Sequence, residues 1–328
     1  MKTTKFLSLL LTATLTLASC SDDNEDIIIK PGEGKTSGDV TNDNKNTSGP
    51  SEAQYRIEFP KLKGENTVVV VHKAILNKNS KEEDINYCVE WDYSIHTQHW
   101  SCYQLYSSIN YHKDYNVSRY GSNDPTIQND GSLSATCQYP NDPDLPSQYR
   151  LTADPYKGSG YDHGHICPSA DRQRATECNY QTFYITNMQP QTKVFNGSDK
   201  NTPADYSPWY RIEDRTRTWA GKFDTLYVCK GGVIGNSTKT IGSGSNKIPV
   251  PSYFFVALLG KKGSTYKAIG FWMEHLGSYS EKKALSNYAV NIDQLEKLTD
   301  FDFFCNLPDE TENAVEKSFK ASDWDNLQ

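Results

Sequence analysis

The stretch GSGYDHGHICPSADR, Gly158 to Arg172, places His163 and His165 one residue apart in a chain that has only seven histidines. Glycines precede and separate them, which suggests a backbone that is bent or closely approached, as helices and central strands rarely are. The imidazole is the side chain that changes charge near neutral pH. The stretch therefore predicts a glycine-flanked turn that presents histidine for chemistry.

The first twenty residues, MKTTKFLSLLLTATLTLASC, combine two lysines, an apolar stretch from Phe6 to Leu17 and small residues. Such a segment is typical of a secretory signal and is too short for a stable membrane span. Its end, LASC, resembles the lipobox of bacterial lipoproteins, which implies a signal peptide over residues 1–19 and a lipid on Cys20. An ordinary signal peptide with a chance cysteine is the alternative. The lipobox implies an exported outer-membrane lipoprotein, held to the membrane by Cys20, at the cell surface or in the periplasm.

Residues 20–54 are rich in Ser, Asn, Asp, Gly and Thr and almost free of aromatic side chains, so they cannot bury a core and predict a flexible acidic tether. Residues 55–328 hold nearly all the aromatic residues and predict one large domain. Besides Cys20 the chain has seven cysteines, an odd number that leaves at least one thiol unpaired. Export permits disulfides, and the absence of a CxxC spacing argues against structural zinc.

A net charge of −7 argues against a broad phosphate-binding surface. Basic residues are nevertheless dense around the histidine motif and after it: Arg150, Arg172, Arg174, Lys193, Arg211, Arg215 and Arg217. This distribution is compatible with a small basic cleft on an acidic body, and equally with a plain solvated surface.

Seven segments rich in β-branched and aromatic residues have the length of strands. They are residues 66–75, 86–95, 99–107, 182–188, 225–235, 252–260 and 266–275. Apolar residues at steps of three and four predict two helices, within residues 207–220 and 291–304. This mixture predicts an α+β domain with a largely antiparallel sheet.

Glu213 and Arg217 stand four residues apart beside the apolar face of the first predicted helix, so they project from the same side. A surface ion pair is the ordinary interpretation of this spacing, and only the neighbouring motifs favour a functional one.

Hydrolysis of a stable ester at neutral pH needs a base that takes a proton from water and a cation that holds the developing charge. A histidine and a hard divalent metal supply both. Magnesium keeps most of its water shell and needs few protein ligands, so the lack of a dense ligand cluster is compatible with it.

The combined motifs resemble the DNA/RNA non-specific endonucleases, the ββα-metal nucleases that include mitochondrial endonuclease G. The family pattern is D-R-G-H, then N-x-x-P-Q, then an asparagine before a helix with L-E and an arginine four residues later. The matching stretches are YDHGHICPSADR, TFYITNMQPQTKVFN, WYRIEDRTR, YKGSGYD and YAVNIDQLEKLTDFDFFCNLPDE, which together span most of the domain. The resemblance implies an α+β ββα-metal fold with a largely antiparallel central sheet flanked by helices.

The resemblance also implies a role for each matching residue. His165 would be the general base that activates water, and Asn196 the single direct ligand of a hydrated Mg²⁺, with Mn²⁺ as the alternative. Glu213 would hold that metal through its water shell, Arg217 would steady phosphate charge, and Asp162 would brace the turn. Arg119 would contact a further phosphate, although its local match is poor.

Two departures from the family pattern affect the expected site. His163 stands where the family has arginine, so a group that is neutral at pH 7 replaces a permanent cation. Either His163 binds substrate when protonated, or that role passes to Arg172 or Arg174. The second departure is the insertion GSDKNTPADYSP between Asn196 and the helix, which must loop outward if Asn196 is to reach the metal.

Three functions are open at this stage. The first is a metal-dependent endonuclease that cuts DNA and RNA outside the cytoplasm, as a monomer or a homodimer. The second is a catalytically impaired protein of the same fold that binds nucleic acid or another polyanion. The third is a surface lipoprotein that binds glycan or protein through its 21 tyrosines, for which no site is evident.

Overall fold

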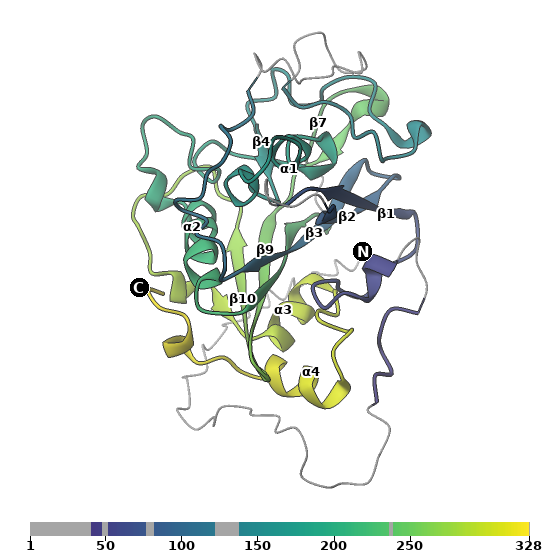
Figure 1. Cartoon of the computed structure of the whole chain (residues 1–328). Helices are drawn as coiled ribbons and strands as arrows, with labels where there is room; N and C mark the ends of the chain where they lie inside the picture. The colour runs from purple at the N-terminus through teal and green to yellow at the C-terminus, as the bar shows by residue number, and fades with distance from the viewer. Residues whose placement is uncertain (1–40, 48–51, 77–81, 122–137, 236–238, 328) are drawn as a thin grey trace, which may run out of the picture.

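The centre of the domain is a seven-stranded antiparallel sheet, seen in a computed structural model that describes residues 41–47, 52–76, 82–121, 138–235 and 239–327 (Figure 1). Its strand order is β1-β2-β3-β6-β9-β10-β11. The strands are β1 (Thr67–Ala74), β2 (Asp84–Asp92), β3 (Thr97–Tyr106), β6 (Thr225–Val233), β9 (Tyr253–Lys262), β10 (Thr265–Glu274) and β11 (Ala289–Val290). Six of the seven strand segments predicted from the sequence are confirmed, as is the α+β class.

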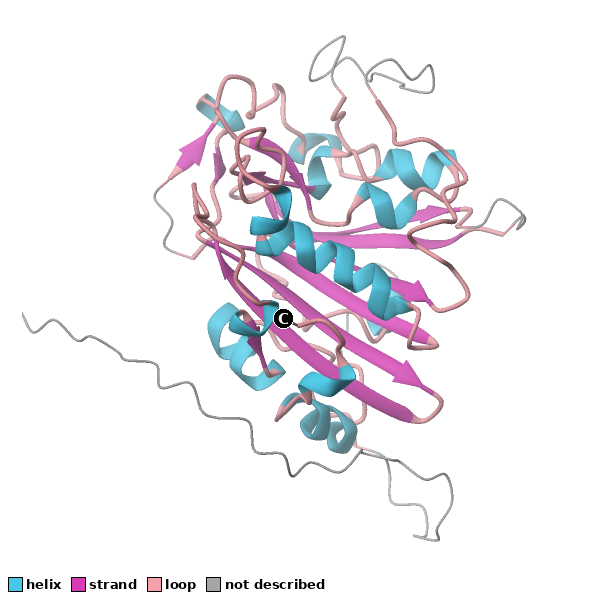
Figure 2. Ribbon diagram, turned by 90° about the vertical axis from the view of Figure 1, so that its left-hand side faces the viewer, coloured by secondary structure: helices cyan, strands magenta, loops and turns pink. Residues whose placement is uncertain are grey.

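Helices cover both faces of this sheet, so the side chains on both faces are buried. In β6, Leu226 and Val228 belong to one hydrophobic cluster, whereas Tyr227 and Cys229 belong to the other. Helix α2 (Pro208–Ala220) packs on the first face, and α3 (Ile292–Thr299) and α4 (Asp309–Glu316) pack on the second. Figure 2 shows α2 crossing the sheet, with the C-terminal helices beyond it.

Both predicted helices form, and side chains set where they begin. Ser207 caps α2 by accepting a hydrogen bond from the amide of Tyr210 at 3.1 Å. Asn291 caps α3 in the same way, but α3 ends at Thr299 rather than near residue 304, because Asp300 adopts a left-handed conformation (φ 58°). Two further helices, α4 and the six-residue α1 (Thr176–Gln181), were not predicted.

The segment predicted as a strand over residues 182–188 is instead a succession of turns, so that prediction was wrong. The amide of Phe183 donates to the carbonyl of Tyr180, and residues Ile185–Asn187 form a 3-10 helix before β5 (Met188–Gln191) begins. Its apolar side chains are buried without belonging to a sheet: the ring of Phe183 packs against His165 at a centroid distance of 4.8 Å.

The histidine motif forms a short strand, β4 (Asp162–His165), which pairs antiparallel with β5. The sequence predicted that a turn would present the histidines, but the strand carries both of them, and the turn lies just before it, where Gly158 and Gly160 have φ values of 71° and 82°. A Cβ on Gly164 would come within 2.2 Å of the Gln191 side chain, so only glycine fits between the two histidines. A second small pair, β7 (Thr240–Ile241) and β8 (Ile248–Pro249), lies beside this region.

Part of the predicted tether packs against the domain. The carbonyl of Thr41 accepts a hydrogen bond from the amide of Asp309, and the Asn44 side chain donates to Asp302 and Glu312. Asn46 is buried and donates to the carbonyls of Gln54 and Pro60. Among the described residues, contacts with the domain are thus already present at residue 41, before the predicted boundary at Tyr55. The predicted signal peptide of residues 1–19, the predicted lipidation site Cys20 and the rest of the segment to residue 40 lie outside the described residues.

The described cysteines are all reduced and buried, and they are Cys88, Cys102, Cys167, Cys178, Cys229 and Cys305. Cys137 lies outside the described ranges. No helix in the ranges that the structure describes is long and apolar enough to span a membrane.

Candidate active site

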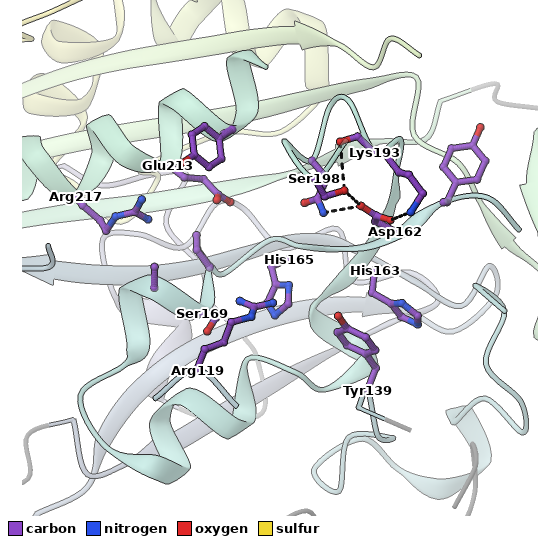
Figure 3. A pocket seen from close by; sticks show the side chains of 15 residues that line it. Arg119, Tyr139, Asp162, His163, His165, Ser169, Lys193, Ser198, Glu213 and Arg217 are labelled. Atoms are coloured by element: carbon purple, nitrogen blue, oxygen red, sulfur yellow. Dashed lines mark hydrogen bonds and ion pairs between the residues drawn. The ribbon is translucent and has the colours of Figure 1, made fainter. Parts of the chain in front are cut away.

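A pocket of about 570 Å³ lies where β4, α2 and the loop before α2 meet. Figure 3 shows α2 supplying Glu213 and Arg217 from one side, while Arg119, His165 and Ser169 come from the other. The remaining lining residues are Tyr139, Tyr161, Asp162, His163, Pro168, Ala170, Lys193, Asn196, Ser198 and Tyr210. All the candidate catalytic, metal and substrate residues predicted from the sequence therefore line one cavity, except Arg172.

His165 is held rigidly but keeps one ring nitrogen available. Its side chain packs edge-on against Phe183 and is only 9% exposed. The imidazole interacts with the backbone of His163 in a way that favours the protonated ring. Its buried Nε2 has no hydrogen-bond partner among the described residues.

The surroundings of His165 keep it neutral. Burial lowers its pKa well below 6.5, and the positive charge of Arg119 lowers it further. The hydrogen bond to the His163 backbone opposes this shift without cancelling it. A neutral imidazole carries a lone pair on one ring nitrogen and can accept a proton, so the site holds a base at pH 7.

Asp162 organises the loop that carries Asn196. Its carboxylate accepts hydrogen bonds from Lys193 Nζ and Asn196 Nδ2, both at 3.0 Å, and from the hydroxyl of Ser198. Burial alone would raise the pKa of Asp162, but these donors outweigh it, and the pKa is lowered. Asp162 thus binds the amide nitrogen of Asn196 and fixes the orientation of this side chain. The amide oxygen of Asn196 accepts no hydrogen bond from any described residue, so it is available to a cation.

The loop that follows Asn196 fits closely against α2. Gly197 has a φ of 71°, and a Cβ there would come within 2.9 Å of the Tyr210 side chain. The insertion predicted to loop outward forms this loop and a 3-10 helix, Ala204–Tyr206, and it leaves Asn196 on the pocket wall.

Glu213 and Arg217 each pair with a residue from another part of the chain, so the interpretation of a surface ion pair between them was wrong. The carboxylate of Glu213 binds Lys230 of β6 at 3.1 Å, and Arg217 binds Asp171 at 3.2 Å. Burial raises the pKa of Glu213 although Lys230 and Arg217 lower it, so this carboxylate would gain from a further cation. Asp171 is itself fixed by the hydroxyl of Tyr103 at 2.9 Å.

His163 lines the pocket, but most of its imidazole is engaged. The ring is stacked between Tyr139 and Tyr156, at centroid distances of 3.8 and 4.0 Å. Its Nε2 lies 3.1 Å from Asp154 Oδ1. A side chain held between two rings and a carboxylate is a poor substitute for a guanidinium that reaches toward phosphate.

Of the predicted substrate-binding arginines, Arg119 has a suitable place and Arg172 does not. Arg119 is exposed at the pocket, where its guanidinium lies 4.8 Å from the centre of the Phe183 ring and forms no ion pair with a described residue. Arg172 is buried outside the pocket and donates to the carbonyls of Asn86, Asp171 and Gln104. Its assignment to substrate binding was therefore wrong. Arg174 also lies outside the pocket.

The sequence did not reveal the residues that support this site. Lys230 is the charged residue inside an otherwise apolar strand, and that anomaly was the available signal. Asp171 and Ser198 lie within or beside the motifs, but the sequence does not indicate that they bind Arg217 and Asp162. Asp154 precedes the matching stretches, Tyr156 begins one of them, and both contact His163 only through the fold.

A second group of possible metal ligands, His72, Asp142 and Asp144, is better explained as structural. His72 and Asp142 are completely buried, Nε2 of His72 lies 2.8 Å from Oδ2 of Asp142, and the same oxygen accepts from the hydroxyl of Thr186. Oδ1 of Asp142 accepts from the amide of Asp144, so hydrogen bonds already use both carboxylate oxygens.

The family model described as DNA/RNA non-specific endonuclease matches residues 71–310, a range that includes every residue of the pocket. A nuclease of Nostoc sp. (strain PCC 7120 / SAG 25.82 / UTEX 2576) is 34% identical over 183 residues, which cover 53% of this chain and 62% of that protein. Nuclease C1 of Cunninghamella echinulata var. echinulata is 30% identical over 177 residues, 52% of this chain and 67% of that protein. Mitochondrial endonuclease G of Bos taurus is 25% identical over 190 residues, 55% of this chain and 60% of that protein. The matched region thus spans from three fifths to two thirds of these relatives.

Among solved structures, a chain of the EndoG/EndoGI complex has a TM-score of 0.54 and 21% identity to this chain, covering 69% of this chain and 85% of that one. At this identity the similarity concerns the fold alone, and it confirms the expected ββα-metal architecture. Of the residues that line the pocket, β4 carries Asp162, His163 and His165, and α2 carries Tyr210, Glu213 and Arg217.

Proposed function

Because this chain belongs to the DNA/RNA non-specific endonuclease family, we propose that its pocket hydrolyses phosphodiester bonds of DNA and RNA without regard to sequence. One observation carries the proposal most directly: a neutral imidazole lies on the wall of a cavity that also holds cations and a few oxygen donors. This combination provides a base and charge stabilisation in the same place.

His165 is the proposed general base. The unprotonated ring nitrogen takes a proton from the attacking water, and the interaction with the His163 backbone steadies the imidazolium that results. The edge of Phe183 fixes the orientation of the ring, so the base is positioned before substrate arrives.

The donors in the pocket fit a hydrated magnesium ion. Asn196 offers its amide oxygen, and Glu213 offers a carboxylate that Lys230 only partly neutralises. Both oxygens of Asp162 are already occupied by donors, which leaves few direct ligands, as magnesium requires. When bound, the ion would stabilise negative charge on the leaving oxygen, and Mn²⁺ accepts the same donors.

Arg217 and Arg119 are the proposed phosphate contacts. Arg217 is oriented by Asp171, whose own position depends on Tyr103. Arg119 reaches the cavity from the opposite side. Two guanidinium groups that face each other across a phosphodiester can bind its non-bridging oxygens.

We further propose that the enzyme acts outside the cytoplasm, attached to a membrane through a lipid on Cys20. The signal-like segment and the LASC sequence support this location. A nuclease without sequence preference also endangers its own genome less when it is exported.

Supercoiled plasmid and RNA, each incubated with the chain from residue 21 onward, test the activity in Mg²⁺ and in EDTA. We expect nicking of both substrates that requires the metal and falls by at least about 100-fold in His165→Ala, the scale of a lost general base. His96→Asn is the matched control, because His96 lies in the turn between β2 and β3, outside the pocket, and asparagine tolerates its positive φ. Binding without cleavage would instead support the catalytically impaired alternative.

A further inference from the structure

A group of three carboxylates lies between α3 and α4, on the face of the sheet that α2 does not cover. Asp293 and Glu296 stand three residues apart on α3, and Glu316 is the last residue of α4. One carboxylate oxygen from each lies within 4.8 Å of the others. These three residues are called the helix-junction carboxylates below.

The helix-junction carboxylates lack partners of opposite charge. Glu316 is only 7% exposed, and its Oε1 has no hydrogen-bond partner. Glu296 accepts one hydrogen bond, from the amide of Phe303 at 2.8 Å. No lysine or arginine in the described ranges forms an ion pair with any of the three, and Lys297 affects Glu296 only at longer range. A buried acid in this state is costly unless something compensates its charge.

Neighbouring groups add negative charge instead of relieving it. Glu312 and Asp302 lie beside the junction, where both accept hydrogen bonds from Asn44. Burial, with the charges of these neighbours, raises the pKa of Glu316 to about 10 and that of Glu296 to about 7. At neutral pH the junction therefore attracts either protons or a cation.

The C-terminal end of α4 favours a cation over a free carboxylate at Glu316, whereas Asp293 lies in the first turn of α3, where the helix dipole stabilises a carboxylate. Glu316 occupies the C-terminal end of α4, where the helix dipole is negative and repels a carboxylate. The same dipole attracts a metal ion. The Asn291 side chain also joins the two helices by donating to the carbonyl of Lys317 at 2.6 Å, so the junction is a fixed meeting point.

We propose that Asp293, Glu296 and Glu316 bind one divalent cation, with calcium preferred, and that this ion fastens α3 to α4. Three carboxylates can supply several oxygens in mono- or bidentate form, which suits the six to eight ligands and flexible geometry of calcium. Magnesium retains its waters and demands near-ideal octahedral geometry, so it binds this group more weakly. The site is separate from the pocket and independent of the proposed catalysis.

Thermal unfolding tests the proposal, with the chain from residue 21 onward freed of metal and titrated with CaCl₂ at pH 7.5. A cation that binds the folded state raises Tm, by an amount on the order of 5 °C when calcium exceeds its Kd a hundredfold. In Glu316→Gln we expect no calcium response and a higher Tm in EDTA than the wild type has, because glutamine removes the cost of taking up a proton when this carboxylate is buried on folding. The exposed Glu310→Gln on the same helix is the control and should respond like the wild type.

Equilibrium dialysis with calcium distinguishes the junction from the pocket. Asn196→Ala, which removes the pocket's amide donor, should keep the junction's calcium and its effect on Tm, whereas Asp293→Asn should lose both. The proposal is overturned if calcium at 10 mM leaves the wild-type Tm unchanged. This concentration is about ten times the Kd of the weakest extracellular calcium sites. The proposal is also overturned if Glu316→Gln responds as strongly as the wild type. In either case protons alone would compensate the carboxylates.

Discussion

At the scale of single residues, the protonation of His165 links its neighbours to the pH dependence of cleavage. Catalysis needs the neutral ring, and burial together with Arg119 lowers its pKa. The acid limb of the kcat/KM profile should therefore have its midpoint below pH 6.5, so that activity persists into acid where an ordinary histidine would already be charged.

Arg119→Met provides the sharper test of this link. Removing the positive charge raises the pKa of His165, so the acid limb should move to higher pH, in addition to any loss of rate from weaker phosphate binding. A pH series of kcat/KM measures both effects. Arg215→Met, which changes a cation of α2 outside the pocket, should leave the limb in place. An unchanged limb in Arg119→Met would show that Arg119 does not act on the base.

The sequence predicted which residues gather at the pocket better than it predicted their partners. His165, Asn196, Glu213 and Arg217 lie in motifs whose order along the chain is characteristic of one family, and the fold brings them together. Their partners, such as Lys230 and Asp171, are chosen by contacts across the sheet that no local pattern encodes. Arg172 was misplaced because a buried arginine and a substrate-binding arginine look alike in a sequence.

At the scale of elements, Ser207 connects the two halves of the metal site. It caps α2, which carries Glu213, and its hydroxyl donates to the carbonyl of Phe195, next to Asn196. Ser207→Ala should lower stability by about 1 kcal/mol and activity by about tenfold, because Asn196 and Glu213 lose their fixed separation.

Asn291→Ala separates these two effects. Asn291 caps α3 and lies outside the pocket, so its loss should lower Tm comparably while kcat/KM is preserved. Unfolding curves and nicking rates for both variants make the comparison. If Ser207→Ala loses stability but no activity, the cap does not position the site.

Elements with a clear period were predicted, and short buried ones were not. Runs such as TVVVVHKA produce strands because β-branched side chains pack well in a sheet. Residues 182–187 carry similar side chains but bury them in turns, and composition does not distinguish the two cases. Helix α1 has only six residues, too few for an apolar period to be visible.

At the scale of the whole molecule, a small basic pocket on an acidic protein should give nucleic-acid binding a weak dependence on salt. Arg119, Lys193 and Arg217 are the cations at the pocket surface, so about three phosphates would be neutralised, with a slope of log K against log [KCl] of about −3 on duplex DNA. Fluorescence anisotropy of a labelled duplex in EDTA measures this slope.

The arginine variant again provides a control. Arg119→Met should reduce the magnitude of that slope by about one unit. A slope near −6 or steeper would mean that phosphates contact a much wider surface than the pocket, contrary to the net charge of −7.

Residues 41–47 contact the domain on the side that lies opposite the pocket. Thr41 and Asn44 contact α4 and its surroundings, while the cavity opens beside α2 on the other side of the sheet. If the upstream segment is attached to a bilayer, as we propose, the attachment is on the face of the sheet opposite the pocket. The pocket would then open away from the membrane, toward nucleic acid in the surrounding medium.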